Sequence, residues 1–349
     1  MIIGTCGFGS TGSSAVSDYL LEFDSVQVLD RKEFTLVAEP DGLVDLEYHL
    51  MHPHYKIYDC KIAIYRFQEH MKRIERGFTR GWKVDKKAYN RIVESFINKI
   101  TTAKWKDILY AADPPLVAYL ERVYSQKVIA RIERFLNKPI VCFPMTDVYL
   151  SVQPQNFYAA SKEFVSELLA EMGADSTKRM IILDQPFGGN NPQAAFPFFD
   201  DPYAIVVDRD PRDNYVFSQT KLLGMNHFYP LGSVQDFVVY YKSQRNNQPY
   251  KQKHERVLCM QFEEMVYDYE YATSKIRKFL KLPENPRPRT IFDPNLSVAN
   301  TQVFKRFPQF YEDVKYIEKH LQDYLFDFDK YPTPVAKGGM FYGKSPLHK

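Results

Sequence analysis

The chain begins with the pattern that most restricts its fold, an apolar strand that runs into a glycine-rich loop and then a helix. The strand is predicted over Ile2–Thr5, and residues 7–14 follow it as GFGSTGSS. A glycine-rich loop that enters a helix leaves backbone N–H groups available to bind a phosphate or sulfate. The spacing matches a nucleoside triphosphate loop, except that Ser13 stands where that motif has lysine. We therefore expect an anion site without the triphosphate clamp; a plain structural turn is the alternative.

A second segment, residues 204–218, has a similar arrangement. An apolar strand ends at Asp208, and Arg209-Asp210-Pro211-Arg212-Asp213 opens the helix that follows. An arginine where a strand ends can bind an anion bidentately. The acidic neighbours are predicted to orient the arginines and cap the helix, rather than to bind Mg²⁺. Two such segments predict a ligand with two separated anionic groups.

Short apolar runs alternate with helical patterns in much of the chain. This alternation predicts a P-loop-like, doubly wound α/β fold, with a parallel sheet of about five strands and helices on both faces. Ligands bind such sheets at the carboxyl ends of the strands, where both segments lie. The other predicted strands are Val26–Leu29, Met180–Asp184, Ala204–Asp208 and Val257–Phe262, and the predicted helices are Ser13–Glu22, Ser161–Met172, Asp213–Leu223 and Tyr271–Leu280.

The stretch at residues 47–144 interrupts this rhythm. Its pattern is charged and mostly helical, as in Lys86–Ile100 and Pro115–Leu136. We predict a single α/β domain over residues 1–328, with 47–144 as a helical insertion over the strand ends. The insertion is interpreted either as a lid or acceptor-recognition part, or as a scaffold without ligand contacts. Residues 329–349, rich in Pro, Gly and Lys, predict an extended C-terminal tail.

Composition narrows the class of protein. A net charge of +3 and a pI of about 8.4 do not favour nucleic-acid binding, for which a basic stripe is expected. The cysteines are scattered, and Cys6, Cys142 and Cys259 lie in apolar runs, which is typical of reduced, mostly buried thiols. The sequence shows neither a transmembrane stretch nor a signal peptide, so we expect a cytoplasmic protein.

Three segments together resemble the sulfotransferase family, which uses 3′-phosphoadenosine 5′-phosphosulfate as donor. Residues 10–14, Ser-Thr-Gly-Ser-Ser, look like the family's 5′-phosphosulfate loop, commonly Lys-Ser-Gly-Thr-Thr. Residues 209–213 resemble the 3′-phosphate motif, and residues 261–280 resemble a late "YEDL…FL" stretch. The resemblance implies a donor held without a metal, at its 5′ end by Gly9, Ser10, Thr11, Gly12, Ser13 and Ser14, and at its 3′-phosphate by Arg209, Ser218 and either Lys305 or Arg306.

Two positions depart from the family pattern. The family's loop lysine aligns with Ser10, so a nearby cation or the loop amides would have to stabilise the transferred group. The candidate cations are Lys32, Arg31 and Lys221. The family serine that binds the 3′-phosphate falls on Phe217, and Ser218 lies about 100° further around the helix.

A local likeness to heparan-type carbohydrate sulfotransferases surrounds Lys32-Glu33-Phe34. It implies that Glu33 is the general base, with Lys32 beside it. A carboxylate within hydrogen-bond reach can take the proton that an acceptor hydroxyl loses as it attacks sulfur. A solvated acid in a polar run is the alternative, and the rival bases are Glu39, Asp41, Asp45 and His49.

Two other groups of residues give weaker evidence of function. His49, His52 and His54 do not have the spacing of a zinc site, and we expect no metal. Residues 184–191 follow a strand and are interpreted equally as a substrate contact or a turn. The expected function is sulfuryl transfer to a small-molecule or carbohydrate acceptor, and the oligomeric state is left open. The alternatives are a small-molecule kinase and a weakly active or inactive nucleotide-binding protein of the same fold.

Overall fold

The computed structural model describes residues 1–52, 58–107, 128–138, 145–220, 229–246, 254–284 and 291–334. The chain divides into two compact units, one made of Met1–Ala38 with Leu169–Lys349 and the other of Glu39–Leu168. The single domain over residues 1–328 with an insertion at 47–144, and both roles considered for that insertion, stay predictions.

The first unit is built on a five-stranded parallel sheet in the order β2-β5-β1-β6-β7. This confirms the predicted parallel α/β sheet, and every predicted strand is present with small shifts of its ends. The strands are β1 (Ile2–Cys6), β2 (Val26–Glu33), β5 (Met180–Asp184), β6 (Pro202–Asp208) and β7 (Val257–Gln261).

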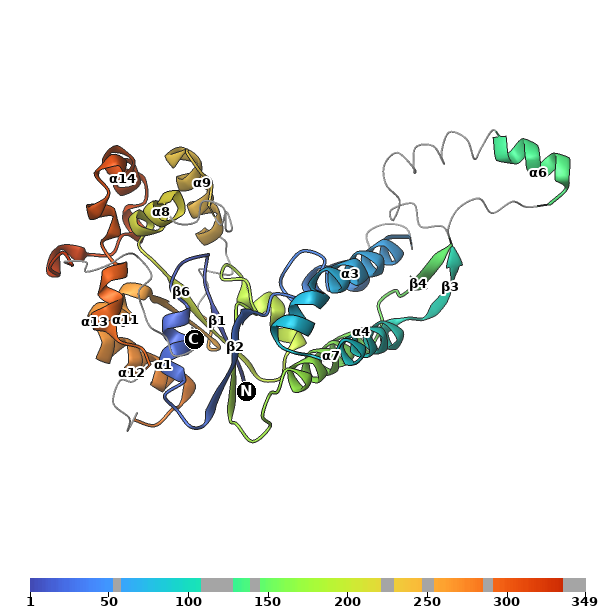
Figure 1. Cartoon of the computed structure of the whole chain (residues 1–349), viewed down its shortest axis with the longest axis horizontal. Helices are drawn as coiled ribbons and strands as arrows, with labels where there is room; N and C mark the ends of the chain where they lie inside the picture. Colours follow the sequence, from blue (N-terminus) through green and yellow to red (C-terminus); the bar gives the residue numbers. More distant parts are fainter. Residues whose placement is uncertain are drawn as a thin grey trace. The chain divides into compact units, whose positions relative to one another are not determined.

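Helices of this unit follow the strands (Figure 1). The predicted helices at Ser13–Glu22, Asp213–Leu223 and Tyr271–Leu280 are confirmed in their described parts. The helices are α1 (Ser14–Leu20), α8 (Pro211–Thr220), α9 (Val234–Arg245), α11 (Phe262–Tyr267), α12 (Tyr269–Leu280), α13 (Pro294–Ser297) and α14 (Tyr311–His320), with 3-10 turns at η4 (Pro192–Phe198), η5 (Val298–Asn300), η6 (Val303–Arg306), η7 (Pro308–Phe310), η8 (Gln322–Tyr324) and η9 (Phe328–Lys330).

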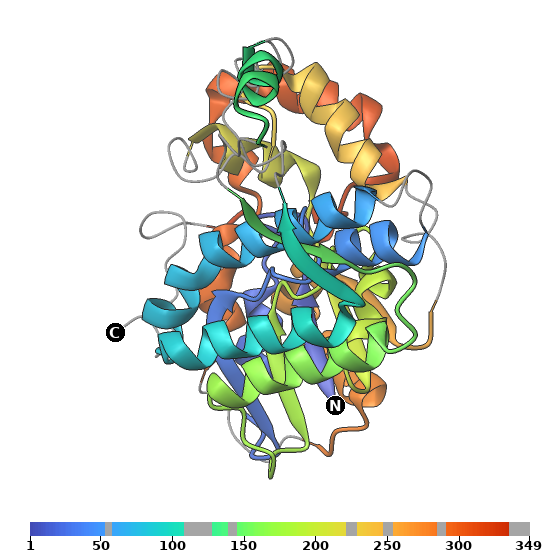
Figure 2. The ribbon, with the colours of Figure 1, turned by 90° about the vertical axis from the view of Figure 1, so that its right-hand side faces the viewer.

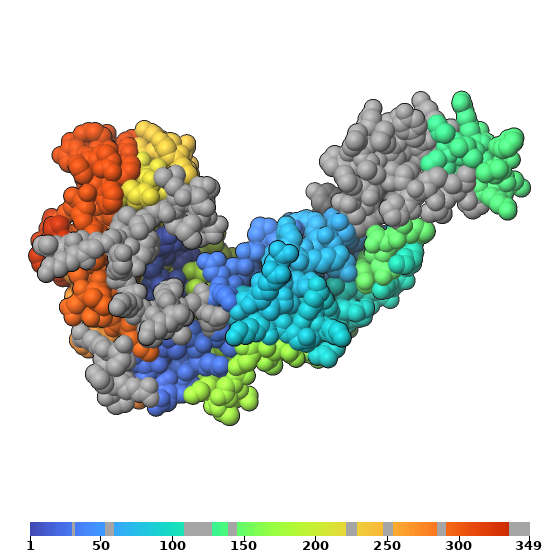
Figure 3. Space-filling model, in the orientation of Figure 1, coloured from blue at the N-terminus to red at the C-terminus, as the bar shows by residue number. Residues whose placement is uncertain are grey.

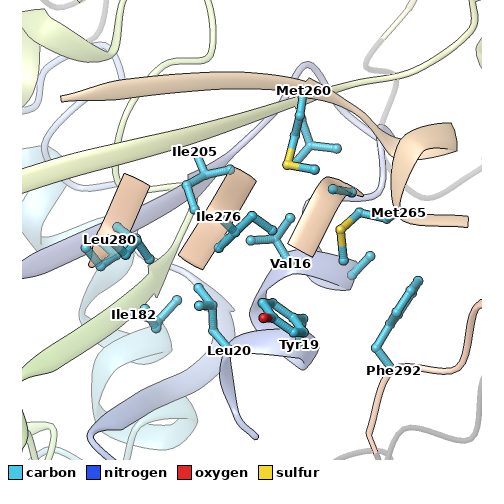
Figure 4. Close-up of a cluster of buried hydrophobic side chains, with 14 of the residues drawn as sticks. Val16, Tyr19, Leu20, Ile182, Ile205, Met260, Met265, Ile276, Leu280 and Phe292 are labelled. Atoms are coloured by element: carbon cyan, nitrogen blue, oxygen red, sulfur yellow. The ribbon is translucent and has the colours of Figure 1, made fainter. Parts of the chain in front are cut away.

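One face of the sheet packs against α1, α11 and α12 (Figure 4). Ile182, Ile205 and Met260 of the strands are buried there against Val16 of α1 and Ile276 of α12. Removal of this apolar surface from water stabilises the layer by roughly 25 cal/mol per Å². The packing fixes the start of α1, and with it the loop that precedes α1.

The opposite face is covered by aromatic side chains and by η4. A Cβ on Gly4 of β1 would lie 2.4 Å from the ring of Phe187, so only glycine allows this ring to approach the sheet. Phe187 in turn packs edge-on against Phe199, with ring centroids 5.1 Å apart. Helical elements therefore lie on both faces of the sheet, as the alternating pattern predicts.

The second unit contains α2 (Leu43–Met51), α3 (Tyr58–Arg76), the π-helical turn η1 (Gly77–Gly81), α4 (Lys86–Ile100), α6 (Ala130–Leu136) and the start of α7 (Phe157–Glu171). Figure 2 shows α4 (cyan) and α7 (green) side by side, where Phe96 stacks on Phe164 with centroids 4.9 Å apart. The predicted helix at Lys86–Ile100 is confirmed, as is the one near Ser161–Met172. Most of the expected helix at Pro115–Leu136 lies outside the described residues.

This unit also contains a two-stranded antiparallel sheet of β3 (Ala103–Asp107) and β4 (Thr146–Leu150). The region expected to be mostly helical therefore also contains a strand at residues 103–107, which the sequence pattern did not predict. The side chains of β3 are mostly exposed, so the strand carries none of the apolar alternation that reveals a half-buried strand.

Three further predictions concern the C-terminal segment, the cysteines and membrane-spanning helices. Tyr331 of the C-terminal segment stacks on Tyr267 with centroids 4.2 Å apart, and residues 335–349 lie outside the described part. Cys259 is exposed on the edge strand β7, which corrects the expectation that it is buried, and Cys142 is not described. Among the residues that the structure describes, no helix combines the length and apolar character needed to cross a membrane.

Candidate functional site

The carboxyl ends of the five strands bring the predicted segments to one edge of the first unit. Glu33 pairs in register with Asp184, Thr5 with the same Asp184, and Asp208 with Gln261. The loop at Gly7–Ser14, called the loop below, therefore lies between the ends of β5 and β6. In the space-filling view the dark blue first residues are visible beside the orange C-terminal elements of the same unit (Figure 3).

The loop has a conformation that requires glycine. Gly9 and Gly12 have φ values of 87° and 88°, and Ser10 adopts a φ of 53° between them. A Cβ on Gly12 would lie 2.4 Å from the ring of Phe262, and one on Gly7 would lie 2.1 Å from the hydroxyl of Thr11. The glycines thus allow both the turn and its close contact with α11.

The outer side of the loop offers a row of hydrogen-bond donors. Within the described part of the chain, the consecutive backbone N–H groups from Gly9 to Ser14 have no hydrogen-bond partner, whereas those of Gly7, Phe8 and Ala15 are bonded. Successive N–H groups in a turn of alternating handedness form an anion-binding concavity. This arrangement can hold a tetrahedral anion.

Gln185 ties the loop to the end of β5. Its Oε1 accepts from Gly7 N at 3.1 Å, and its Nε2 donates to Ser13 Oγ at 3.1 Å. Its own backbone has a φ of 51°, a left-handed conformation that is unusual for glutamine. We call Gln185 the clamp residue of the loop. The sequence contains no signal for it, so a turn and a substrate contact were equally good interpretations of residues 184–191.

Arg209 lies beneath the loop and is only 2% exposed. Its Nη1 donates to Ser10 O at 3.1 Å, and its Nη2 donates to Asn300 O. The guanidinium is packed against the rings of Phe217 and Phe262, 4.1 and 5.0 Å from their centroids. The residue therefore joins the loop to the segment at residues 299–306.

Three buried acids surround Arg209 and with it form what we call the buried network: Arg209, Asp210, Asp213 and Glu263. Asp210 pairs with Arg212 at 2.8 Å, as predicted for an orienting acid. Burial and the neighbouring Asp210 carboxylate raise the pKa of Glu263 to about 8, and burial also raises the pKa of Asp213. Within the described chain, Glu263 Oε2, Asp213 Oδ2 and Arg209 Nε have no hydrogen-bond partner.

A second buried arginine supports the start of the loop. Arg245 of α9 forms two hydrogen bonds to the carboxylate of Asp208, at 2.7 and 2.6 Å. Its guanidinium lies between the rings of Phe8 and Tyr241, 4.0 and 3.4 Å from their centroids. Arg245 stands in a sequence stretch without a motif, so sequence reasoning missed it.

The remaining predicted 3′-phosphate residues are Ser218 on α8 and Lys305 and Arg306 in the segment at residues 299–306, which Arg209 reaches at Asn300 O. Ser218 is buried, and its hydroxyl donates to Tyr215 O at 2.7 Å. Arg306 Nη2 donates to Ala299 O at 2.5 Å, and burial lowers its pKa. Lys305 is exposed and donates to Gln302 Oε1 at 2.7 Å.

Lys32 and Glu33 are both exposed at the end of β2. Phe34 N donates to Asp184 O at 2.7 Å, directly before the clamp residue Gln185. This hydrogen bond brings the chain around Glu33 to the same edge as the loop. Of the other candidate cations, Lys221 and the side chain of Arg31 lie outside the described residues.

The rival bases belong to the second unit. Arg66 binds both Asp41, at 2.6 Å, and Asp45, at 2.9 Å. His49 Nδ1 lies 3.0 Å from Asp59 Oδ2. Among the described residues, which exclude His54, no group of three or more side chains could hold a metal ion.

Comparison of the sequence with protein-family models and with curated proteins finds no match. The solved structures that match this chain include three sulfotransferases, each 13% identical to it. The sulfotransferase domain of the Synechococcus PCC 7002 olefin synthase has a TM-score of 0.39 and aligns over 90% of this chain and 93% of its own.

The other two neighbours are the sulfotransferase domain of the curacin biosynthetic pathway and the sulfotransferase STF9 of Mycobacterium avium. The curacin domain aligns over 96% of this chain and 98% of its own, with a TM-score of 0.39. STF9 aligns over 91% and 76%, with a TM-score of 0.33. These values are too low to add to the fold description above, which rests on sheet order and register.

Proposed function

We propose that this protein is a sulfotransferase that moves a sulfuryl group from 3′-phosphoadenosine 5′-phosphosulfate to a hydroxyl acceptor. The observation that carries the proposal is the row of N–H donors from Gly9 to Ser14, which have no partner among the described residues and lie at the sheet edge where Glu33 also lies. The loop contains no lysine, so it lacks the cation with which a triphosphate loop holds the β- and γ-phosphates. Ser13, at the lysine position of a triphosphate loop, argues against a kinase.

The loop holds the 5′-phosphosulfate in this proposal. The amides from Gly9 to Ser14, with the hydroxyls of Ser10, Thr11, Ser13 and Ser14, stabilise the charge that builds on the bridging oxygen. Donors fixed in place before the reaction need no reorganisation during it. The proposed transfer assigns this role to the loop and not to a metal.

Glu33 is proposed as the general base, with Lys32 beside it. Its carboxylate takes the proton of the acceptor hydroxyl as the hydroxyl oxygen forms a bond to sulfur. The bond between sulfur and the phosphate oxygen breaks on the opposite side, and 3′,5′-adenosine diphosphate leaves with the bonding electron pair. The likeness around Lys32 supports a carbohydrate acceptor, and a small molecule is the alternative.

The 3′-phosphate end is proposed to lie beside Arg209 and the segment at residues 299–306. Lys305 supplies the exposed cation of this region. Arg306 adds a half-buried positive charge, and the hydroxyl of Ser218 is the weakest candidate because it is bonded to a carbonyl group of its own helix.

A cytoplasmic location is also proposed, because Cys6, Cys60 and Cys259 are free thiols, as is usual in a reducing compartment.

Calorimetric titration tests the donor site. We expect 3′,5′-adenosine diphosphate to bind with micromolar or tighter affinity and ATP with Mg²⁺ to bind much more weakly. A preference for Mg-ATP would replace the proposal by a kinase, and binding of neither nucleotide would indicate a fold kept without its ligand.

Replacement of the proposed base tests the chemistry. Glu33→Gln keeps the shape of the side chain but cannot accept the proton, so we expect kcat to fall by about a hundredfold or more while nucleotide affinity is unchanged. Glu312→Gln on α14, an exposed glutamate, is the matched control. Unchanged turnover in Glu33→Gln would reject Glu33 as the base.

A second candidate is a protein that binds the nucleotide without turnover. The absence of a cation from residues 7–14 favours it, since the loop amides alone would have to stabilise the leaving group. Tight binding of 3′,5′-adenosine diphosphate with no transfer to a panel of hydroxyl acceptors would support this candidate.

A further inference from the structure

Arg209 directs its guanidinium at backbone carbonyls on two sides. It reaches Ser10 O in the loop and Asn300 O in the segment at residues 299–306. Phe217 and Phe262 pack against the guanidinium, which is almost completely buried. A group in this position is held by the protein and is not presented to solvent.

The contact with Ser10 fixes the direction of one loop amide. The peptide that joins Ser10 to Thr11 is trans, so the carbonyl of Ser10 and the N–H of Thr11 point to opposite sides. Because Arg209 holds the carbonyl on the inner side, the N–H of Thr11 points to the outer side. It belongs to the row of amides that have no partner within the described chain.

The charge of Arg209 is compensated inside the buried network. Asp213 is its main electrostatic partner, and Glu263 and Asp210 contribute less. Asp210 also pairs with Arg212 at 2.8 Å. Arg209 therefore acts on the loop through its hydrogen bond to Ser10 O and not as an unpaired charge.

We propose that Arg209 is a positioning residue of the loop, which aims the Thr11 amide at the 5′ anion of the ligand by holding the carbonyl of Ser10. The proposal rests on the proposed nucleotide site. It differs from direct recognition of the 3′-phosphate by Arg209, because it assigns the effect of this residue to the opposite end of the ligand.

Three simple nucleotides separate the two roles: 5′-AMP, which engages the loop end alone, 3′-AMP, and 3′,5′-adenosine diphosphate. In Arg209→Met we expect the affinities for 5′-AMP and the bisphosphate to fall by the same factor, about tenfold or more, while 3′-AMP binding stays unchanged. Arg209→Lys keeps a positively charged hydrogen-bond donor, so it should recover much of the lost affinity. If Arg209 served only in packing, this variant would recover none of it. Lys315→Met, an exposed change on α14, is the control.

The opposite pattern would overturn the inference: loss of 3′-AMP binding with 5′-AMP binding unchanged. Thermal unfolding shows whether each variant folds, and Arg209→Lys carries the same ligand comparison if Arg209→Met does not fold. In the wild-type protein, 5′-AMP should shift the amide resonance of Thr11 and leave the Arg209 Nε–H resonance nearly unmoved. A shift of that Nε–H by 3′-AMP alone would also contradict the inference. If the wild type binds none of the three nucleotides, the proposed function itself fails.

Discussion

The loop and the end of β6 (Asp208–Asp213) both connect an apolar strand to a helix, yet their polar groups have opposite roles. The loop keeps its amides from Gly9 to Ser14 without partners in the described chain. At the β6 end, the Asp208 carboxylate is occupied by Arg245, and Asp210 is occupied by Arg212. The first region offers donors to a ligand, and the second holds the protein together.

The difference has a physical origin. Backbone amides in a tight turn cannot all be satisfied within the turn, so they remain available to an anion. Charged side chains at a buried strand end must instead be paired, because an unpaired buried charge is very costly. A strand followed by an arginine in the sequence therefore does not reveal whether the guanidinium faces a ligand or the protein.

The largest effect is expected where the β6 end is broken. Arg245→Met leaves the carboxylate of Asp208 buried without its partner and removes the cation between the rings of Phe8 and Tyr241. Loss of one member of a buried pair typically destabilises a protein by about 3–5 kcal/mol. We expect a loss of this size in the free energy of unfolding, measured by urea denaturation.

A surface ion pair is the control for this change. Arg256 pairs with Asp201 at 3.1 Å, and both side chains are at least one-third exposed. Arg256→Met should cost no more than about 1 kcal/mol. Equal losses of unfolding free energy in the two variants would show that the buried pair of Arg245 and Asp208 contributes no more than a surface pair. The structural role assigned to the β6 end would then be wrong.

The next effect concerns the loop. Gly12→Ala places a methyl group against the ring of Phe262 at a φ of 88°, so both the ring and the turn must move. A left-handed conformation costs an alanine about 1–2 kcal/mol before any clash. We expect a similar loss of stability and a loss of affinity for 3′,5′-adenosine diphosphate of at least tenfold, measured by calorimetry.

Gly173→Ala is the control for Gly12→Ala, because it introduces the same backbone strain without displacing the loop. Gly173 has a φ of 89°, but a Cβ there meets nothing within 4 Å. This variant should lose stability without losing nucleotide affinity. A matching loss of affinity in Gly173→Ala would mean that general destabilisation, not the shape of the loop, explains the effect at Gly12.

The sequence predicted the parts of this edge that depend on local pattern. Apolar runs bounded by turn residues identified all five strands, and glycine spacing identified the loop, because both signals lie within a few consecutive residues. The partners of the loop could not be found in this way. Gln185 and Arg245 reach it from residues far along the chain, and nothing in their local sequence marks them.

The same limit applies to Arg209 and to β3. The motif at residues 209–213 correctly predicted that Asp210 orients Arg212, a contact between near neighbours. The inward direction of Arg209 depends on rings supplied by Phe217 and Phe262 and on the carbonyl of Asn300, which the motif does not include. The strand β3 was missed because its exposed side chains leave no periodic signal.

A smaller effect is expected at the link between β5 and the loop. Gln185→Ala removes the acceptor of Gly7 N and the donor to Ser13 Oγ. Each neutral hydrogen bond contributes about 1 kcal/mol, so we expect affinity for 3′,5′-adenosine diphosphate to fall by about three- to tenfold. Gln27→Ala, which removes the donor to Gly173 O and the acceptor of Asp175 N near the start of β2, should leave the affinity nearly unchanged. An equal fall in both variants would argue against a specific clamp.

The smallest effect is a pH dependence confined to the buried network. The carboxyl of Glu263 faces Arg209, Asp210 and Asp213, and its pKa is raised from 4.5 to about 8 by burial and by Asp210. Between these two pH values the folded protein binds more protons at this group than the unfolded chain does. The contribution of Glu263 to stability therefore falls as the pH rises from about 5 to 8, and Asp213, whose pKa is also raised, contributes in the same direction.

Glu263→Gln keeps the acceptor for Asp210 N but cannot ionise. We expect its unfolding free energy to fall less steeply than that of the wild type over pH 5–8, with the gap widest near pH 8, in urea denaturation series. Glu312→Gln, at an exposed position on α14, should follow the wild-type curve. Because the donors of the loop are uncharged amides, nucleotide affinity in Glu263→Gln should depend on pH much less than stability does. Parallel stability curves for Glu263→Gln and the wild type would mean that this carboxyl is already ionised in the folded protein over this pH range.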